Sequence, residues 1–318
     1  MRAMVLPRFG GPNLFEERQI DRPAPAPGQV LVRIIAASVN PVDTKIRQDG
    51  RWAHLEPPVV LGYDAAGVVE EVGQGVTDLA AGDEVWFTPE IMGNPHGTYA
   101  EYTIVAASIV ARKPAHLSFE EAASVPLAGG TAWEAIVRRL QVRPGQVVLI
   151  HGGAGGVGSF AVQFARLCGA RVLATASAEH QKTLADLGAD VPIDYRSQDP
   201  VAIALEETGG VGVDAAFDIQ GPELVSRCLP SVRSFGRVAC ILPPQGDLRL
   251  LYFRNITLCG VFLTRERQRL EELARAFQSG QVRPLVEQVL ALERVADAHR
   301  RLETGHGRGK VVLQVARG

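Results

Sequence analysis

The chain has 318 residues, of which 46% are apolar and 21% are charged, and its net charge is −2. This composition is typical of a folded globular protein, and the length exceeds what one ordinary hydrophobic core needs, so we expect two domains. The basic residues are scattered along the sequence, which gives no electrostatic reason to expect nucleic acid or an anionic membrane as the main partner.

The sequence also bears on the cellular compartment. No apolar run reaches the roughly 18 residues that a membrane-spanning helix needs. The N-terminal stretch MRAMVLPRFGGP lacks the apolar segment of a secretory signal. The four cysteines lie at wide spacings inside apolar stretches such as RVACIL, where a reduced, buried thiol is the ordinary interpretation. We therefore expect a cytoplasmic protein without a membrane partner.

Residues 1–122 contain short β-type runs bounded by glycine and proline. The runs are VLVRIIAASV (30–39), VVLGYDAAGVVEEVG (59–73), DEVWF (83–87) and YAEYTIV (99–105). Helical periodicity is scarce between them, and turn-forming stretches such as PAPAPGQ and MGNPHG are frequent. The pattern predicts an irregular, strongly bent antiparallel barrel.

After residue 122, apolar strands alternate with helical segments. The predicted strands are VVLIHG (147–152), RVLATAS (171–177), VPIDY (191–195), VDAAFDIQG (213–221), GRVACIL (236–242) and ITLCGVFL (256–263). Six apolar strands separated by helices predict a parallel sheet covered on both faces, in the doubly wound arrangement that binds dinucleotides. From residue 265 on, two charged amphipathic helices and a last strand, KVVLQV (310–315), are expected to return to the first domain.

The strongest motif is a glycine-rich loop in the stretch VVLIHGGAGGVGSFAVQFAR, which contains G-x-G-x-x-G. The loop follows an apolar strand and opens a helix. In that context the backbone can approach a pyrophosphate and the helix N-terminus can bind it. A tight turn that binds nothing is the alternative. The predicted phosphate contacts are Gly153, Ala154, Gly155, Gly156, Val157 and Gly158.

The end of the strand 171–177 favours NADPH over NADH. An NAD-preferring site places Asp or Glu there, about 20 residues after the glycine loop, to bind the ribose 2′-OH. This chain has Ala176 and Ser177 at that position. Ser177 can donate to a 2′-phosphate and Lys182 can reach it, although they can also be a helix N-cap and a solvated side chain. Glu179 is an acid close by, but an acid in a first helical turn has its own reason in the helix dipole.

Taken in order, these stretches resemble the medium-chain dehydrogenase/reductase superfamily, and within it the zinc-independent quinone oxidoreductases related to zeta-crystallin. The resemblance covers nearly the whole chain and rests on SVNPVDTKIR (38–47), GYDAAGVVEEVG (62–73), GDEVW (82–86), GTYAEY (97–102), HGGAGGVG (151–158), IDYR (193–196) and RGKVVL (308–313). It implies a GroES-like β-barrel catalytic domain (1–122), a Rossmann domain with a doubly wound, six-stranded parallel sheet (123–264), and a returning C-terminal segment (265–318). The nicotinamide is expected in a cleft between the two domains.

The resemblance also implies that the zinc site of metal-dependent relatives is lost. Those relatives place Cys soon after the strand that corresponds to 30–39, and a His-Glu pair after the glycine that corresponds to Gly62. This chain has Asn40 in the first place and Tyr63-Asp64 in the second. These side chains do not supply the three or four converging N or S ligands that zinc needs, so we expect no metal.

The chemistry follows from the expected lack of a metal. Alcohol oxidation at neutral pH is poorly supported without a Lewis acid, whereas hydride transfer to an electron-poor acceptor needs less help. The predicted function is an NADPH-dependent enzyme that transfers hydride to a small electrophile, either a quinone or an α,β-unsaturated carbonyl. One alternative is an enoyl-thioester reductase of the same superfamily, with Lys45, Arg47 and Arg51 as a basic entrance. Another is an NADPH-binding structural or regulatory protein with little turnover.

The resemblance assigns further site residues. Asn40 should hydrogen-bond near the nicotinamide ribose, Thr131 should line the nicotinamide pocket, and Tyr195 should meet the 2′-phosphate. Tyr63 is either the proton donor or a ring packed against the barrel, so Asn40 and Tyr63 are the candidate catalytic residues. Asp64 is expected to orient neighbouring backbone rather than to act as an acid. The remaining expected cofactor contacts are Leu242, Phe262, Leu263 and Thr264.

The last strand of the parallel sheet predicts a homodimer. The stretch ITLCGVFL (256–263) is apolar and has no charged residue that would protect an open sheet edge. Pairing with the same strand of a second copy around a two-fold axis would satisfy the free backbone groups. Coverage of this edge by a loop or by the C-terminal helix is the alternative.

Overall fold

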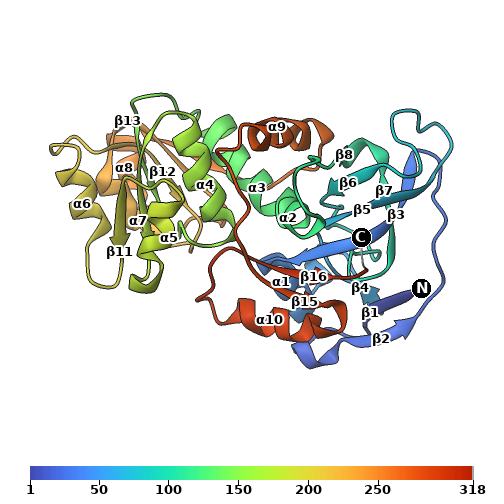
Figure 1. Cartoon of the computed structure of the whole chain (residues 1–318). Coiled ribbons are helices and arrows are strands. Elements are labelled where there is room, and N and C mark those ends of the chain that lie inside the picture. The colour runs from blue at the N-terminus through green and yellow to red at the C-terminus, as the bar shows by residue number, and fades with distance from the viewer. Residues whose placement is uncertain (317–318) are drawn as a thin grey trace. The chain divides into compact units, whose positions relative to one another are not determined.

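The computed structural model describes residues 1–316, and the chain divides into two compact units. Unit 1 comprises Met1–Ala128, Thr264–Gln278 and the residues from Pro284 on, and unit 2 comprises Gly129–Leu263 and Ser279–Arg283. Figure 1 shows the order of the elements along the chain.

Unit 1 is built on two sheets. Its strands are β1 (Arg2–Leu6), β2 (Glu16–Gln19), β3 (Gln29–Val39), β4 (Val59–Val60), β5 (Ala65–Val72), β6 (Glu84–Phe87), β7 (Tyr102–Ala106), β8 (Val110–Arg112), β15 (Val286–Ala291) and β16 (Lys310–Gln314). The smaller sheet has the order β2-β1-β4, and the larger has the order β15-β16-β3-β5-β6-β8, with β7 also paired to β3. Strands β15 and β16 run parallel, and the other paired strands described in this unit run antiparallel.

Strand β3 organises the larger sheet because it is long and almost fully buried. It pairs with β5 on one side and with β16 and β7 on the other. Its register against β5 shifts between Leu31 and Val32 and again between Ile34 and Ala36, and such irregularities bend a strand. Strand β15, which pairs in parallel with β16, has no counterpart among the predicted strands. Its sequence VEQVLA is partly polar and lies between two amphipathic helices, which hides the strand signal.

The helices of unit 1 connect or follow these strands along the chain. They are α1 (Pro41–Gln48), α2 (Phe119–Ala123), α9 (Arg267–Gln278) and α10 (Val295–Glu303), and α3 (Pro126–Trp133) carries the chain from unit 1 into unit 2. A π-helical segment, η4 (Glu134–Arg139), continues α3. Short 3-10 turns are η1 (Pro12–Leu14), η2 (Arg51–Ala53), η3 (Ala107–Ile109), η5 (Ala178–His180), η6 (Leu229–Ser231) and η7 (Leu292–Arg294).

Unit 2 contains a six-stranded sheet in which every neighbouring pair is parallel, which confirms the predicted α/β architecture. The strands are β9 (Val147–Ile150), β10 (Arg171–Ala176), β11 (Val191–Asp194), β12 (Val213–Asp218), β13 (Val232–Cys240) and β14 (Thr257–Gly260), in the order β11-β10-β9-β12-β13-β14. The helices are α4 (Gly156–Leu167), α5 (Gln181–Asp186), α6 (Pro200–Glu206), α7 (Leu224–Cys228) and α8 (Arg249–Phe253).

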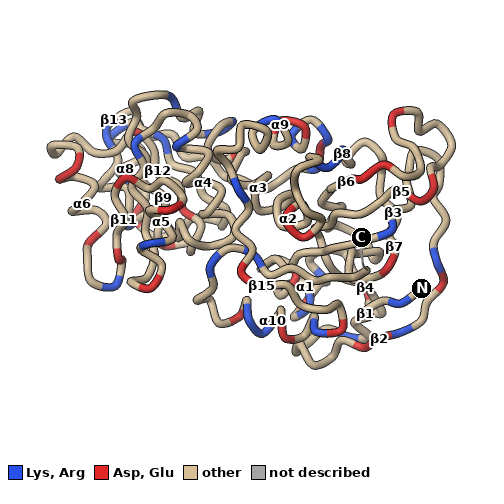
Figure 2. Tube along the Cα trace, viewed as in Figure 1, with Lys and Arg blue, Asp and Glu red and all other residues tan. Residues whose placement is uncertain are grey.

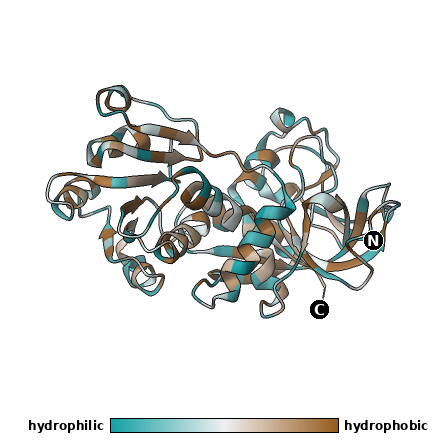
Figure 3. Cartoon of the chain, turned by 90° about the horizontal axis from the view of Figure 1, so that it is seen from above, coloured by the Kyte–Doolittle hydropathy of each residue, from teal (hydrophilic) through white to brown (hydrophobic). Residues whose placement is uncertain are grey.

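The core of unit 2 explains the run of apolar strands in the sequence. Leu149, Leu173, Ala216 and Val238 come from four neighbouring strands, and all four are fully buried in one apolar cluster. Figure 3 shows the hydropathy of these segments along the trace. The strand order reverses at β9, whose neighbours are β10 and β12. In open parallel sheets, ligands bind outside the carboxyl ends of the strands at such a switch point.

Strand β14 is shorter than the predicted strand 256–263. Gly260 pairs with Cys240, which is the last residue of β13. Strand β13 therefore offers no further residue with which β14 could pair. The Val261 N–H still donates to the Cys240 carbonyl at 2.8 Å, and the sheet ends there. The prediction of β14 as an edge strand agrees with the strand order, but its predicted length was wrong.

The surface and the helices add two negative observations. Lys and Arg are interspersed with Asp and Glu along both units (Figure 2). Within residues 1–316, no helix combines the length and the hydropathy that crossing a membrane requires.

Candidate functional site

The glycine loop of unit 2 lies at the carboxyl end of β9 and leads directly into α4. Gly152 has a φ of +71°, a left-handed conformation that favours glycine, and Gly155 is the N-cap of α4. The first N–H groups of an α-helix have no carbonyl partner within the helix. They are therefore available to an anion at the N-terminus of α4, where the helix dipole also favours negative charge.

The space around the three motif glycines fits this role. A Cβ on Gly158 would lie 2.0 Å from the Gly152 carbonyl oxygen, so only glycine allows the loop to close on the helix. A Cβ on Gly153 would lie 2.8 Å from the side chain of Leu184 in α5, so glycine lets α5 pack closely against the loop. A Cβ on Gly155 would meet only the Gly152 carbonyl, at 3.4 Å, so its outer side is open to a ligand. The loop therefore fits a dinucleotide pyrophosphate.

His151 is the residue after β9. It is buried, its Nε2 atom has no hydrogen-bond partner among residues 1–316, and burial lowers its pKa to about 4. The ring is therefore neutral at neutral pH, and it does not act as a proton donor there.

The predicted 2′-phosphate residues are partly brought together. Tyr195 lies beside Ala176, with its N–H 3.4 Å from the Ala176 carbonyl oxygen, and its side chain is half exposed. The Ser177 hydroxyl donates to Glu179 at 3.0 Å. The ammonium of Lys182 lies 2.9 Å from both carboxylate oxygens of Asp186, one turn further along α5.

The residues expected at the nicotinamide end lie in both units. In unit 2, Thr131 on α3 and Leu263 are buried, Leu242 after β13 is half-buried, and Phe262 is exposed. In unit 1, the Thr264 carbonyl and hydroxyl oxygens accept from the guanidinium of Arg269 at 2.5 and 3.2 Å.

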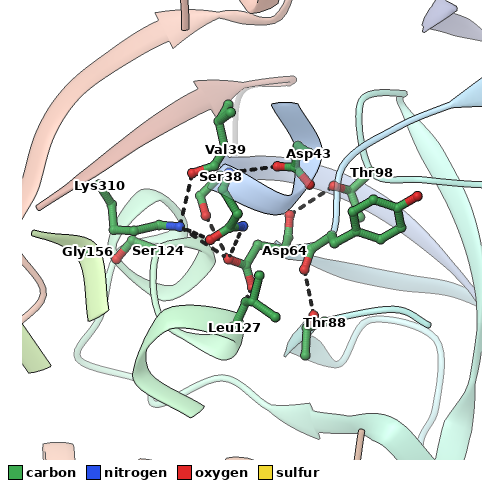
Figure 4. Close-up of polar contacts among 12 residues, drawn as sticks. Ser38, Val39, Asp43, Asp64, Thr88, Thr98, Ser124, Leu127, Gly156 and Lys310 are labelled. Carbon is green, nitrogen blue, oxygen red and sulfur yellow. Dashed lines mark hydrogen bonds and ion pairs between the residues drawn. The ribbon is translucent and has the colours of Figure 1, made fainter. Parts of the chain in front are cut away.

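A buried group of polar side chains in unit 1 joins the start of α1, the segment between β4 and β5, and the start of β16 (Figure 4). Asn40 Nδ2 donates to Asp64 Oδ2 at 2.8 Å. Lys310 Nζ donates to Asn40 Oδ1 and to the Val39 carbonyl, and lies 3.5 Å from Asp64 Oδ2. The carboxamide of Asn40 is thus oriented by a cation on its oxygen and an anion on its nitrogen. One Nδ2 hydrogen is left for a ligand.

Asp64 is saturated with donors. Its Oδ2 also accepts from the Ser38 hydroxyl at 2.9 Å, and its Oδ1 accepts from the Leu127 N–H at 2.7 Å. Burial raises the pKa of Asp64, while Lys310 and these donors oppose the rise. Burial lowers the pKa of Lys310, and the charge of Asp64 opposes that change. Asp64 therefore orients its neighbours and has no free oxygen for proton exchange.

The hydroxyl of Tyr63 takes no part in these hydrogen bonds. The ring is buried, and its oxygen has no hydrogen-bond partner among the described residues. Burial and the charge of Asp43 raise the pKa of Tyr63, and Arg265 lowers it. The phenol is therefore protonated over the whole physiological range, and it can donate a hydrogen bond without ionising.

A second buried chain of polar groups starts at Asp43 in α1. Its Oδ2 accepts from the Asn40 N–H at 2.7 Å and from the Tyr99 hydroxyl at 2.8 Å, and His299 Nε2 lies 3.3 Å from the same hydroxyl. Burial raises the pKa of Asp43 to about 7 and lowers the pKa of His299 to about 3. Sequence reasoning did not single out Lys310, Tyr99 or His299, because each lies in an ordinary strand or helix pattern.

Zinc does not fit these residues. Asn40 and Asp64 are bonded to each other and to the ammonium of Lys310, and Tyr63 is a protonated phenol. Within residues 1–316, no three His, Cys, Asp or Glu side chains are grouped so that they could hold a metal ion.

Comparison with known proteins identifies the family. Residues 26–115 match the model of the alcohol dehydrogenase GroES-like domain, and residues 187–313 match the model of the zinc-binding dehydrogenases. The NADPH-dependent alkenal/one oxidoreductase of Arabidopsis thaliana chloroplasts is 36% identical over 98% of this chain and 79% of its own length. The chain belongs to the medium-chain dehydrogenase/reductase superfamily.

Other proteins are also similar over nearly the whole chain. The quinone oxidoreductase of Lama guanicoe is 32% identical over 98% of this chain and 97% of its own length. Among solved structures, an NAD-dependent alcohol dehydrogenase superposes with a TM-score of 0.93 at 35% identity, covering 99% of this chain and 100% of its own. A mycobacterial protein in complex with NADPH superposes with a TM-score of 0.89 at 33% identity, with the same coverage. Unit 1 contains the GroES-like part and unit 2 the Rossmann-type sheet of this superfamily.

Proposed function

We propose that this chain is an NADPH-dependent reductase that transfers hydride to a quinone or an α,β-unsaturated carbonyl without a metal ion. The observation that carries the proposal is the group formed by Asn40, Asp64 and Lys310. Asn40 and Asp64 stand at positions where the resemblance places zinc ligands in metal-dependent relatives, and here their side chains are hydrogen-bonded to each other and lie beside the ammonium of Lys310. Membership in the family and the glycine loop of unit 2 support the binding of a dinucleotide cofactor.

The choice of NADPH rests on three supports. Ala176 and Ser177 stand where an NAD-preferring site has an acid. The similar Arabidopsis protein is named as NADPH-dependent, and the similar mycobacterial protein was solved with NADPH. The likeness to an alcohol dehydrogenase named as NAD-dependent shows that the fold alone does not decide between the cofactors.

The division of labour between cofactor and chain follows from the chemistry. NADPH, when bound, supplies the hydride, which is the difficult part of the reaction. We assign the glycine loop, Thr131 and the residues 261–264 to cofactor binding, and Asn40 to a hydrogen bond near the nicotinamide ribose. The buried Tyr63 hydroxyl is assigned as the donor to the carbonyl oxygen of the acceptor. A hydrogen-bond donor at that place would stabilise the negative charge that develops on that oxygen. The proton that completes the reduction then comes from water.

An enoyl-thioester reductase is less well supported by the structure. Its predicted basic entrance, formed by Lys45, Arg47 and Arg51, was wrong. Arg47 is buried and bonds to Glu303 and the Gly10 carbonyl. Arg51 is exposed but paired with Asp49 at 2.7 Å. The three cations therefore do not make one open surface for an acidic carrier.

We further propose that the chain forms a homodimer through β14, the edge of the parallel sheet. Exposed aromatic side chains stand on or near this edge, namely Phe235, Tyr252, Phe253 and Phe262, each 70–82% exposed. Large exposed apolar groups beside an open strand edge are typical of an interface. The four cysteines are free thiols, which suits the reducing cytoplasm where we place the protein.

A substrate panel tests the reductase proposal. Steady-state oxidation of NADPH is measured with ortho- and para-quinones, 2-alkenals, enones, an enoyl thioester and simple ketones. Turnover confined to quinones and activated alkenes supports the proposal. Preferred turnover of the thioester, or tight NADPH binding without turnover of any member, would favour one of the two alternatives.

A further inference from the structure

Three buried side chains form one line of hydrogen bonds in unit 1, and we call this line the buried chain. Asp43 is on α1, Tyr99 precedes β7 and His299 is on α10. The Tyr99 hydroxyl donates to Asp43 Oδ2 at 2.8 Å, and His299 Nε2 lies 3.3 Å from the same hydroxyl oxygen. Because a hydroxyl has one hydrogen, which Tyr99 gives to Asp43, the contact with His299 needs a hydrogen on Nε2.

Both ends of the buried chain carry a polar atom without a partner. Among residues 1–316, His299 Nδ1 and Asp43 Oδ1 are buried and make no hydrogen bond. Such atoms are rare in folded proteins, and each calls for a reason. With the hydrogen on Nε2, the Nδ1 atom of His299 can take up a proton. Asp43 Oδ2 already accepts from the Tyr99 hydroxyl and the Asn40 N–H, so the proton of a neutral Asp43 resides on Oδ1.

The inner end of the buried chain lies next to Tyr63. A Cβ on Gly62 would lie 2.6 Å from the Tyr99 ring, so this ring packs directly against the residue before Tyr63. Burial, and then the charge of Asp43, raise the pKa of Tyr63. The Tyr63 hydroxyl is itself buried and has no hydrogen-bond partner among the described residues. The phenol assigned as donor to the acceptor therefore lies in the same buried region as Asp43.

The outer end of the buried chain lies one helical turn from a side chain that reaches solvent. Glu303 follows His299 by four residues on α10, so the two side chains share one face of the helix. The Glu303 side chain is 30% exposed and pairs with the guanidinium of Arg47. Glu303 therefore brings a solvent-exposed carboxylate to the His299 end of the chain.

The protonation states suit proton delivery near neutral pH. Burial raises the pKa of Asp43 to about 7, so this carboxyl can hold a proton there and release it. Burial, and then the charge of Arg47, lower the pKa of His299 to about 3, so the ring is neutral and can only exchange one hydrogen for another. The other charged groups that face these side chains are Lys310 and Asp64 beside Asp43, and Arg265 beside Tyr63.

We propose that the buried chain, from Glu303 at the surface through His299, Tyr99 and Asp43, delivers to Tyr63 the proton that completes the reduction. Once the acceptor has received the hydride, its oxygen carries a negative charge. The Tyr63 hydroxyl gives its proton to that oxygen and receives the Oδ1 proton of Asp43, directly or through one water molecule. Tyr99 then gives its proton to Asp43 Oδ2, and His299 Nε2 gives its proton to Tyr99.

The protons balance in this sequence. His299 Nδ1 takes up one proton from the Glu303 side, so one proton enters from water and one leaves on the product. The transfers are concerted, so Tyr63 is never left ionised, and the hydrogen bonds reorient before the next turnover. This inference rests on the proposed function, and it names the residues that carry the proton from water to the acceptor.

The test removes the central hydroxyl of the buried chain. Tyr99→Phe keeps the ring, and Thr103→Val is the matched control, because the Thr103 hydroxyl is also buried in unit 1 but donates to the His96 carbonyl at 2.7 Å. Steady-state reduction of the best quinone or enone is followed in H2O and in D2O, with NADPH and with NADPH deuterated at the transferred hydrogen. Tyr99→Phe should lower kcat about 10-fold or more and leave the KM for NADPH within about two-fold. Thr103→Val should keep the kcat of the wild type.

The isotope effects separate proton delivery from a structural role. In Tyr99→Phe the proton becomes the slow step, so the solvent isotope effect on kcat should rise above that of the wild type and the effect of deuterated NADPH should fall. His299→Gln should show the same pattern, because glutamine keeps a donor for Tyr99 but cannot exchange one ring proton for another. This second variant carries the test if Tyr99→Phe fails to fold.

The results that would overturn the proposal are distinct. An unchanged kcat in Tyr99→Phe or His299→Gln would show that no proton passes through the buried chain. A lowered kcat with an unchanged solvent isotope effect would show that the variant only displaces the site. Either result in a protein that reduces quinones or enones overturns the chain alone. A wild type that oxidises NADPH with no acceptor of the panel would overturn the proposed function together with this inference.

Discussion

Lys310 places its ammonium 3.5 Å from the carboxylate of Asp64, and the exposed fractions of the two side chains are only 4% and 0%. The pair ties the first residue of β16 to the segment before β5, and through Asn40 to the start of α1. A buried charge pair of this kind is costly to break, because removing one partner leaves the other unpaired and desolvated. The pair therefore predicts measurable effects on stability.

Replacing Lys310 by Met should destabilise the fold strongly. The variant leaves Asp64 buried without its cation, and such losses are typically about 3–5 kcal/mol in the free energy of unfolding. Urea unfolding measures the change. A second replacement, Asp64→Asn, should restore part of the lost stability, because the uncompensated charge is then gone.

Lys113→Met is a matched control for this variant. Lys113 is also buried in unit 1, but its partner Glu84 is half exposed and can return to water. Its loss should therefore cost clearly less than the loss of Lys310. Equal losses for the two lysines, or no rescue by Asp64→Asn, would mean that the charge pair is not what stabilises this part of unit 1.

The stability of the protein should depend on pH through Asp43. Its folded-state pKa is raised from 3.8 to about 7 by burial, so the native state holds a proton that the unfolded chain releases. The stabilising contribution of this carboxyl is therefore full below about pH 4 and is lost as the pH rises to about 7. At about 1.4 kcal/mol per pKa unit, the loss is on the order of 4 kcal/mol.

Comparison with Asp43→Asn isolates this effect from other titrations. The variant does not titrate at this position, so its stability relative to the wild type should rise between pH 4 and pH 7 and level off above. Denaturant unfolding at a series of pH values measures the difference. A difference that stays constant over this range would show that Asp43 does not hold its proton in the native state.

The carboxylate of Glu179 should weaken NADPH binding. It accepts the hydroxyl of Ser177, the residue expected to donate to the 2′-phosphate, and it brings a negative charge close to that group. Glu179→Gln should therefore tighten NADPH binding by about three-fold to ten-fold, since like charges at a partly exposed site repel modestly, and leave NADH binding nearly unchanged. Fluorescence titration with both cofactors measures the ratio. Equal changes for NADPH and NADH would place Glu179 away from the phosphate.

Much of unit 2 is predictable from the sequence because its signals are local. Buried parallel strands are continuous apolar runs, and the glycine motif has one strand–turn–helix context. The site in unit 1 was harder to predict. Asn40, Asp64 and Lys310 are far apart in sequence, and only the pairing of β16 with β3 brings the lysine to the other two. Nothing in the stretch RGKVVL distinguishes a buried functional lysine from a solvated one at a strand start.

The dimer prediction can be tested at the sheet edge. Thr257 is an exposed residue of β14, and Thr257→Lys places a charge there that a partner strand would have to bury. The wild type should run as a dimer in light scattering at micromolar concentration, and the variant should dissociate. Val261 is a poorer position for this test, because its side chain is buried and a charge there would disturb folding itself. A monomeric wild type would contradict the proposal.

Hydride transfer by the metal-stripped enzyme tests the proposed metal-free reaction most directly. The protein is treated with a strong chelator, its metal content is determined by elemental analysis, and oxidation of NADPH is followed with the best quinone or enone of the panel. Because Asn40, Tyr63 and Asp64 do not supply the ligands that zinc needs, we expect less than stoichiometric zinc in the protein. We also expect a rate of NADPH oxidation that neither chelation nor added zinc changes. Stoichiometric zinc in the untreated protein, or loss of activity on chelation with recovery on adding zinc, would show instead that the reaction depends on a metal.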